Sequence, residues 1–136
     1  MAGSGGRSAV VDCVNSMSDP TIPLTINEWD EWGDPRDQAA RAYLESYSPY
    51  DNVPVGRRPD LLVTGSLHDP RVLVHEPAKW VARLRATGPG AAGLPGRVLF
   101  RAELGAGAHV GPAGRYDKLA YEAEILAFIL DAGGPR

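Results

Sequence analysis

The sequence has 136 residues, of which 43% are hydrophobic and 23% charged, with a formal net charge of -3. These values are ordinary for one soluble globular domain, and the negative charge argues against nucleic-acid binding, which needs basic surfaces. Cys13 is the only cysteine, so an internal disulfide and a multi-cysteine zinc site are excluded and a reducing, cytoplasmic setting is expected. The sequence has no apolar run of about 18 residues and no signal-peptide core, so no membrane span is expected.

The first 35 residues contain few signals of regular structure. Residues 1–9 are rich in glycine and serine, which is typical of a flexible tail. The apolar residues of Val10–Val14 indicate the end of a buried strand. From Asn15 to Pro35 we expect a loop, because Pro20 and Pro23 break any helix.

Helices and strands alternate in the rest of the chain. A short helix is predicted over Asp37–Ser46, and the branched apolar residues of Leu61–Thr64 predict a buried strand. A second helix is predicted over Glu76–Ala86, with Pro77 in its first turn, where a missing N–H costs nothing. Val98–Ala102 then predicts a second buried strand.

The last predicted helix lies near the C-terminus. Its apolar face consists of Leu119, Ala123, Leu126, Ala127 and Leu130. Because strands alternate with helices, the sheet should be parallel and its crossovers right-handed. The predicted fold class is therefore α/β, with parallel strands and flanking helices in three layers over residues 10–134.

Two polar loops follow the two predicted strands. The loop Gly65–Val72 contains Asp69, and the loop Gly105–Gly111 contains His109. Ligands of open α/β sheets bind at the carboxyl ends of the strands, so we expect the two loops to meet at one edge. An Asp followed by a His matches the chain order of the acid and the base in α/β-hydrolases. From spacing alone, a capping Asp and an exposed His remain the alternative.

A nucleophile for such a pair is difficult to find. Gly6–Val10 resembles the elbow Gly-x-Ser-x-Gly around Ser8, but Val10 replaces the second glycine and no helix pattern follows. We therefore interpret Ser8 as part of the flexible tail.

Four stretches of the sequence carry a resemblance to a known family. They are Ser46–Val53, Gly65–Val72, Glu76–Arg85 and Gly114–Asp117. In this order they resemble the oligopeptidase B branch of the prolyl oligopeptidase family of serine peptidases. The likeness runs from about Val11 to Gly133, and it implies the C-terminal half of an α/β-hydrolase domain.

The resemblance also implies roles for five residues. Asp69 corresponds to the catalytic acid and His109 to the catalytic base. The family cleaves short peptides after Arg or Lys, and its acidic turn binds that basic side chain, which makes Glu28 and Asp30 candidates for substrate binding. Arg71 matches a position that contacts the substrate backbone. A solvated acidic turn and a surface arginine are the alternatives for these three residues.

The sequence departs from the family pattern in ways that bear on activity. The β-propeller, the nucleophile elbow and the oxyanion-hole donors of the family have no counterpart in it, and Ala108 adds one residue before His109. A displaced His would weaken catalysis, since a shift of ~1 Å costs about a hundredfold in rate. We expect the chain alone to be inactive, with no metal or cofactor, and to need an upstream fragment that carries the propeller and the elbow. The alternative is a non-catalytic remnant that docks on another chain.

Overall fold

A computed structural model of the chain describes residues 4–7, 10–56, 58–87, 96–109 and 111–134. In chain order the elements are β1 (Ser4–Arg7), α1 (Cys13–Ser18), α2 (Thr25–Trp32), α3 (Gln38–Tyr47), β2 (Leu61–Ser66), α4 (His75–Ala86), β3 (Val98–Glu103) and α5 (Arg115–Gly133). The structure confirms the two expected helices as α3 and α4 and the two expected strands as β2 and β3. Their bounds differ from the expected ones by one or two residues. Asp37 explains where α3 begins, because its side chain accepts hydrogen bonds from the backbone N–H groups of Ala39 and Ala40.

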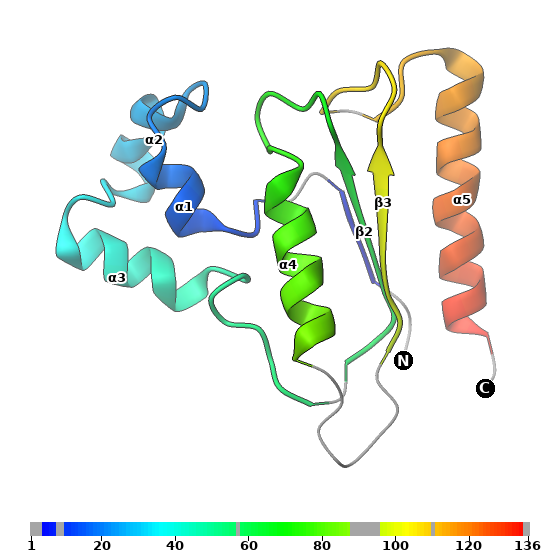
Figure 1. Ribbon diagram of the computed structural model, residues 1–136, viewed down its shortest axis with the longest axis horizontal. Helices are drawn as coiled ribbons and strands as arrows, with labels where there is room; N and C mark the ends of the chain where they lie inside the picture. The colour runs from blue at the N-terminus through cyan, green and yellow to red at the C-terminus, as the bar shows by residue number, and fades with distance from the viewer. Residues whose placement is uncertain (1–3, 8–9, 57, 88–95, 110, 135–136) are drawn as a thin grey trace.

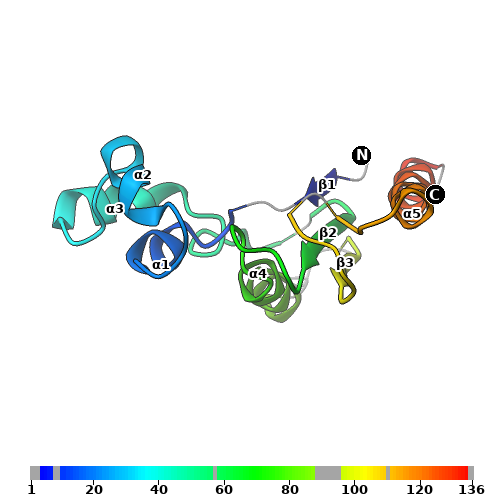
Figure 2. The same cartoon turned by 90° about the horizontal axis from the view of Figure 1, so that it is seen from above.

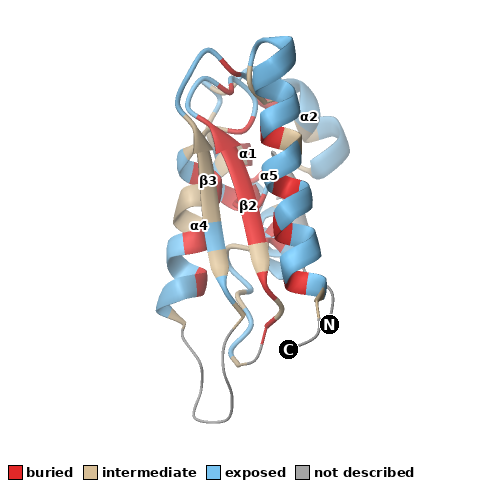
Figure 3. Cartoon of the chain, turned by 90° about the vertical axis from the view of Figure 1, so that its right-hand side faces the viewer, coloured by how far each residue is buried: buried red, intermediate tan, exposed pale blue. Residues whose placement is uncertain are grey.

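The described residues form one parallel sheet in the order β1-β2-β3. Leu61 of β2 lies opposite Ser4 of β1 on one side and Val98 of β3 on the other. The central strand β2 is buried over all but its first residue, as its branched apolar side chains predict (Figure 3).

Two helices cover the two faces of this sheet. α4 lies on one face and α5 on the other (Figures 1 and 2). Val81 and Leu84 of α4 are buried, and α5 contributes the buried residues Tyr121, Ile125 and Phe128. The three-layer α/β fold is therefore confirmed. Although α5 has 19 residues, no helix in the described part of the chain is long and apolar enough to cross a bilayer.

The other three helices, α1, α2 and α3, form a small lobe beside the sheet (Figure 1). Its core consists of the buried residues Cys13, Val14, Met17 and Leu44, with Trp29 packed against them. The indole of Trp29 also donates a hydrogen bond of 2.9 Å to the carbonyl of Met17, which joins α2 to α1.

This lobe makes two expectations for the N-terminal part of the chain wrong. Val10–Val14 does not end a strand, because α1 begins at Cys13. Residues 15–35 are not one loop, because they include most of α1 and all of α2. Pro20 and Pro23 lie between these helices, so the two prolines separate them without breaking either.

The residues expected to form a flexible tail include a strand. Residues 4–7, within the expected tail 1–9, pair with β2 as β1. Pairing in a sheet uses backbone groups, so a glycine-rich stretch without apolar side chains can still add a strand. Ser8 lies outside the described residues.

The buried face of α5 also differs from the expected one. Every residue of the expected face, Leu119, Ala123, Leu126, Ala127 and Leu130, is exposed. The helix packs on the sheet through Tyr121, Ile125, Phe128 and Ala132 instead, in one cluster with Leu62 of β2. The cause is that α5 is apolar on both sides, so the sequence pattern did not decide which side meets the sheet.

Candidate active site

Asp69 lies in the turn that follows β2, where its own backbone neighbours hold its carboxylate. Oδ1 accepts hydrogen bonds from the backbone N–H groups of Arg71 at 2.9 Å and Val72 at 3.0 Å. Asp residues favour such turns because the short side chain reaches the amides two and three residues ahead. The carboxylate is only 1% exposed, so it is both fixed in direction and shielded from water.

His109 lies in a tight turn between β3 and α5. Ala108 and Gly111 close this turn by exchanging two backbone hydrogen bonds of 3.1 and 3.0 Å. Gly111 has a φ of 93°, a conformation that favours glycine. Nδ1 of His109 lies 3.0 Å from Oδ2 and 3.3 Å from Oδ1 of Asp69. The added residue Ala108 is part of the turn and does not separate the ring from the carboxylate.

The pairing fixes how the imidazole carries its proton. An ionised carboxylate only accepts hydrogen bonds, so Nδ1 of His109 carries the proton and Nε2 is the basic nitrogen. The histidine side chain is 37% exposed, against 1% for the side chain of Asp69. This arrangement suits proton transfer, because the buried negative charge stabilises the imidazolium that forms.

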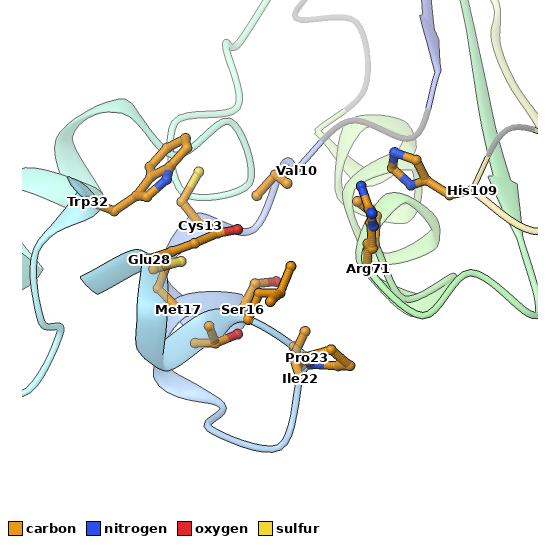
Figure 4. Close-up of a pocket in the computed structure, with 13 residues that line it drawn as sticks. Val10, Cys13, Ser16, Met17, Ile22, Pro23, Glu28, Trp32, Arg71 and His109 are labelled. Atoms are coloured by element: carbon orange, nitrogen blue, oxygen red, sulfur yellow. The ribbon is translucent and has the colours of Figure 1, made fainter. Parts of the chain in front are cut away.

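A cavity of about 330 Å³ opens beside His109 (Figure 4). Arg71 and His109 form one end of it, and Glu28 of α2 lies across from them. The wall between the two ends is largely apolar and includes Met17 and Val10. The structure thus brings three of the expected site residues, Glu28, Arg71 and His109, to one cavity. Asp69 does not line the cavity but lies behind His109, in contact with its ring.

Asp30 does not share this position with Glu28. The expected acidic turn is the helix α2, in which side chains two residues apart point about 200° apart. Asp30 is exposed and is not one of the residues that line the cavity. Among the two acidic candidates, the structure therefore places only Glu28 at the site.

Two cavity residues were not expected from the sequence because the helix α1 was not predicted. Cys13 and Ser16 of α1 both line the cavity. Burial, followed by the nearby Glu76 carboxylate, raises the pKa of the Cys13 thiol, so the thiol stays protonated at neutral pH. The spacing of Val14 and Met17, three residues apart and both buried, is the signal that could have indicated α1.

A buried carboxylate at the start of α4 holds the α1 segment in place. Oε1 of Glu76 accepts hydrogen bonds from the backbone N–H groups of Val11 at 2.6 Å and Asp12 at 3.0 Å. Oε2 accepts one from the hydroxyl of Ser16 at 2.7 Å. Lys79 of α4 forms an ion pair with the buried Asp12, and this hydrogen bond raises the pKa of Lys79. The cavity wall is thereby tied to the helix that covers the sheet.

Within the part of the chain that the structure describes, no group of three or more His, Cys, Asp or Glu side chains is placed to hold a metal ion.

Comparisons with known proteins agree on the kind of protein. The sequence matches the prolyl oligopeptidase family over residues 6–135. It is 50% identical to Protease 2 from Moraxella lacunata over 124 residues, which cover 91% of this chain and 17% of that protein. It is 46% identical to Dipeptidyl aminopeptidase BI from Pseudoxanthomonas mexicana, over 91% of this chain and 16% of that protein. The chain thus spans about a sixth of the length of these relatives.

Solved structures give the same result. Oligopeptidase B from Leishmania major superposes with a TM-score of 0.87 at 35% identity, over 97% of this chain and 18% of that one. Oligopeptidase B from Trypanosoma brucei with covalently bound antipain superposes with a TM-score of 0.81 at 38% identity, over 96% of this chain and 17% of that one. The resemblance found in the sequence is confirmed, and because the family match covers nearly every residue, the chain belongs to the prolyl oligopeptidase family of serine peptidases.

Proposed function

We propose that this chain supplies the Asp-His part of the active site of a serine peptidase that cleaves short peptides after Arg or Lys. The observation that carries the proposal is the hydrogen bond between Asp69 and Nδ1 of His109 beside a cavity that contains Glu28. In this mechanism Nε2 of His109 takes the proton of a serine hydroxyl and then gives it to the leaving amine. Asp69 keeps the ring in the required tautomer and stabilises the imidazolium.

The cavity suits a basic substrate side chain. The guanidinium of an Arg residue would bind the carboxylate of Glu28, a charge-assisted contact that Arg can make with two parallel hydrogen bonds. The methylene groups of the same side chain would lie against the apolar wall around Met17. Arg71 lines the cavity at the end where His109 lies and would contact the substrate backbone near the scissile bond.

The serine nucleophile is proposed to come from outside this sequence. Five described serine hydroxyls donate hydrogen bonds elsewhere: Ser16 to Glu76, Ser18 to Val14, Ser46 to Tyr43, Ser48 to Val11 and Ser66 to Gly107. Ser8 lacks the glycine that a nucleophile elbow needs at position 10. The relatives are about six times longer, so a further segment of such a protein has room for both the serine and the oxyanion-hole donors.

Two surfaces favour docking of such a segment. β1 forms one edge of the sheet among the described residues, and an added strand could pair with it. The outer side of α5 exposes Leu126 and Leu130, with 58% and 76% of each residue accessible. A strand beside β1 and a helix beside α5 would cover both surfaces. The same surfaces also fit the second candidate function, a non-catalytic half-domain that docks on another chain.

Reconstitution tests the proposal and separates the two candidates. The chain is mixed with the complementary remainder of Protease 2 from Moraxella lacunata, and hydrolysis of arginyl, lysyl and leucyl fluorogenic peptides is measured. We expect the two pieces together to cleave the arginyl and lysyl substrates, and the chain alone to cleave none. A stable complex without turnover would favour the non-catalytic candidate. Labelling of the chain alone by a fluorophosphonate would contradict an external nucleophile.

A further inference from the structure

Ser66, the last residue of β2, makes an unusual contact for a residue in a buried strand. It is 2% exposed, and its hydroxyl donates a hydrogen bond of 2.8 Å to the backbone carbonyl of Gly107. Gly107 is also buried and lies two residues before His109. A hydroxyl inside a sheet is costly unless it is hydrogen-bonded, and a bond between two buried groups is protected from competition by water.

The loop that Ser66 contacts has little intrinsic stiffness. Glycines occupy positions 105, 107 and 111, and glycine loses more conformational freedom on ordering than any other residue. Near its start, Oε1 of Glu103 accepts a hydrogen bond of 2.8 Å from the Gly105 N–H. Near its end, Ala108 and Gly111 close the turn around His109. The hydrogen bond from Ser66 holds the backbone at Gly107, between the contact at Gly105 and the turn that begins at Ala108.

We propose that Ser66 is a positioning residue for His109. Ser66 and Asp69 both belong to the end of β2, so one short segment holds the loop backbone through the serine and the ring through the carboxylate. The Ser66 bond adds an attachment of the loop backbone to the end of β2 beside the ring contact, so we expect the position of His109 relative to Asp69 to become less well defined without it. This inference rests on the proposed role of His109 as the base, and Ser66 itself does not touch substrate.

NMR of the isotopically labelled 136-residue chain tests this without any peptidase activity. We expect a slowly exchanging Nδ1 proton on His109 in the natural chain. In Ser66→Ala this proton resonance should broaden or disappear, and amide exchange at Ala108 and Gly111 should become about five- to tenfold faster, the size expected for one hydrogen bond. Ser46→Ala is the matched control, because it removes an exposed hydroxyl that bonds to Tyr43 within α3.

A second pair of variants separates the hydroxyl from packing. Thr and Val have nearly the same shape, so Ser66→Thr and Ser66→Val share any cost of added volume and differ in the hydroxyl. We expect Ser66→Thr to keep the Nδ1 proton resonance and Ser66→Val to lose it.

The outcomes that overturn the inference are distinct from those that overturn the proposed function. An unchanged resonance in Ser66→Ala, equal spectra for Ser66→Thr and Ser66→Val, or no protected Nδ1 proton in the natural chain would each overturn the positioning role. Failure of the reconstituted pair to cleave peptides, with the Ser66 effect still present, would instead refute the peptidase function and leave the positioning role intact.

Discussion

Asp69 and His109 are 40 residues apart in the sequence, yet Oδ2 of Asp69 lies 3.0 Å from Nδ1 of His109. The carboxylate is almost fully buried, whereas the imidazole is partly exposed and lines the cavity. Two different strands deliver the two side chains, and the parallel arrangement of β2 and β3 brings their ends to the same edge of the sheet. The contact between Asp69 and His109 therefore follows from the sheet topology. Its role can be tested by removing the charge of Asp69.

Asp69→Asn should reduce kcat of the reconstituted enzyme by about 10⁴-fold, because an amide no longer favours the tautomer with the proton on Nδ1. Asp131→Asn provides the control, since Asp131 is an exposed carboxylate that pairs with Arg97, a residue next to the start of β3, whereas His109 follows the end of that strand. The measurement is steady-state hydrolysis of an arginyl peptide. A loss of less than tenfold in Asp69→Asn would show that the pair does not work as proposed.

The two acidic candidates on α2 give a second prediction. Glu28→Gln should lower kcat/KM for arginyl substrates by about 10- to 100-fold, the value of one hydrogen bond to a charged group, with little change for a leucyl substrate. Asp30→Asn is the matched control two residues away and should leave both substrates within about twofold, because Asp30 does not line the cavity. Equal losses in the two variants would show that both carboxylates bind the substrate.

The sequence predicted the elements whose signals are local. Leu61–Thr64 is a run of branched apolar residues, and Asp37 caps a helix, so β2 and α3 follow from their own residues. The Asp69–His109 pair was implied by the family resemblance, because spacing alone left a capping Asp and an exposed His as the alternative. The structure brings the two side chains within 3.0 Å of each other at the ends of two neighbouring parallel strands.

The parts that were missed depend on distant contacts. α1 has six residues and is held by Glu76, more than 60 positions away along the chain, which no local pattern reports. An acidic turn does not distinguish the directions of Glu28 and Asp30, whereas the helix α2 points them to different sides. The buried side of α5 was undecided for a different reason, since both of its sides are apolar.

The role of Glu76 in holding α1 leads to a stability prediction. In Glu76→Gln an amide replaces the carboxylate: its NH2 group cannot accept from the Ser16 hydroxyl as Oε2 does, and its uncharged oxygen accepts less strongly from the Val11 and Asp12 N–H groups. We expect the free energy of unfolding to fall by about 1–3 kcal/mol. Urea denaturation followed by circular dichroism measures it, with the exposed Glu45→Gln as control, for which a change within about 0.5 kcal/mol is expected. Equal midpoints for the two variants would contradict the anchoring role.

Acid should loosen the start of the His109 loop. The hydrogen bond from Arg101, followed by the one from the Gly105 N–H, lowers the pKa of Glu103 in the folded chain below its ordinary value. Because the pKa of Glu103 is lower in the folded chain than in the unfolded chain, the ionised carboxylate stabilises the fold. This stabilisation is fully present at a pH above the unfolded-state pKa and is lost as the pH falls through the folded-state pKa. The protection factor of the Gly105 amide, which compares its exchange rate with the intrinsic rate at the same pH, should therefore fall below about pH 4.5, the ordinary range for Glu. In Glu103→Gln this loss of protection should be absent, and its persistence there would assign it to another group.

The exposed side of α5 predicts how the chain behaves without a partner. Leu119, Leu126 and Leu130 are each more than half exposed, and large apolar side chains exposed on one helix promote association. We expect the chain alone to self-associate as its concentration rises, measured by sedimentation velocity.

The double variant Leu126→Lys and Leu130→Lys places two charges on this side of α5 and should remove most of the self-association. It should also prevent the complementary fragment from restoring peptidase activity, because the same surface serves both contacts. Val55→Lys is the control, since Val55 is 82% exposed but lies between α3 and β2, away from this helix. If the double variant were still activated as strongly as Val55→Lys, the fragment would have to dock elsewhere, and the edge of β1 would be the surface left to carry the contact.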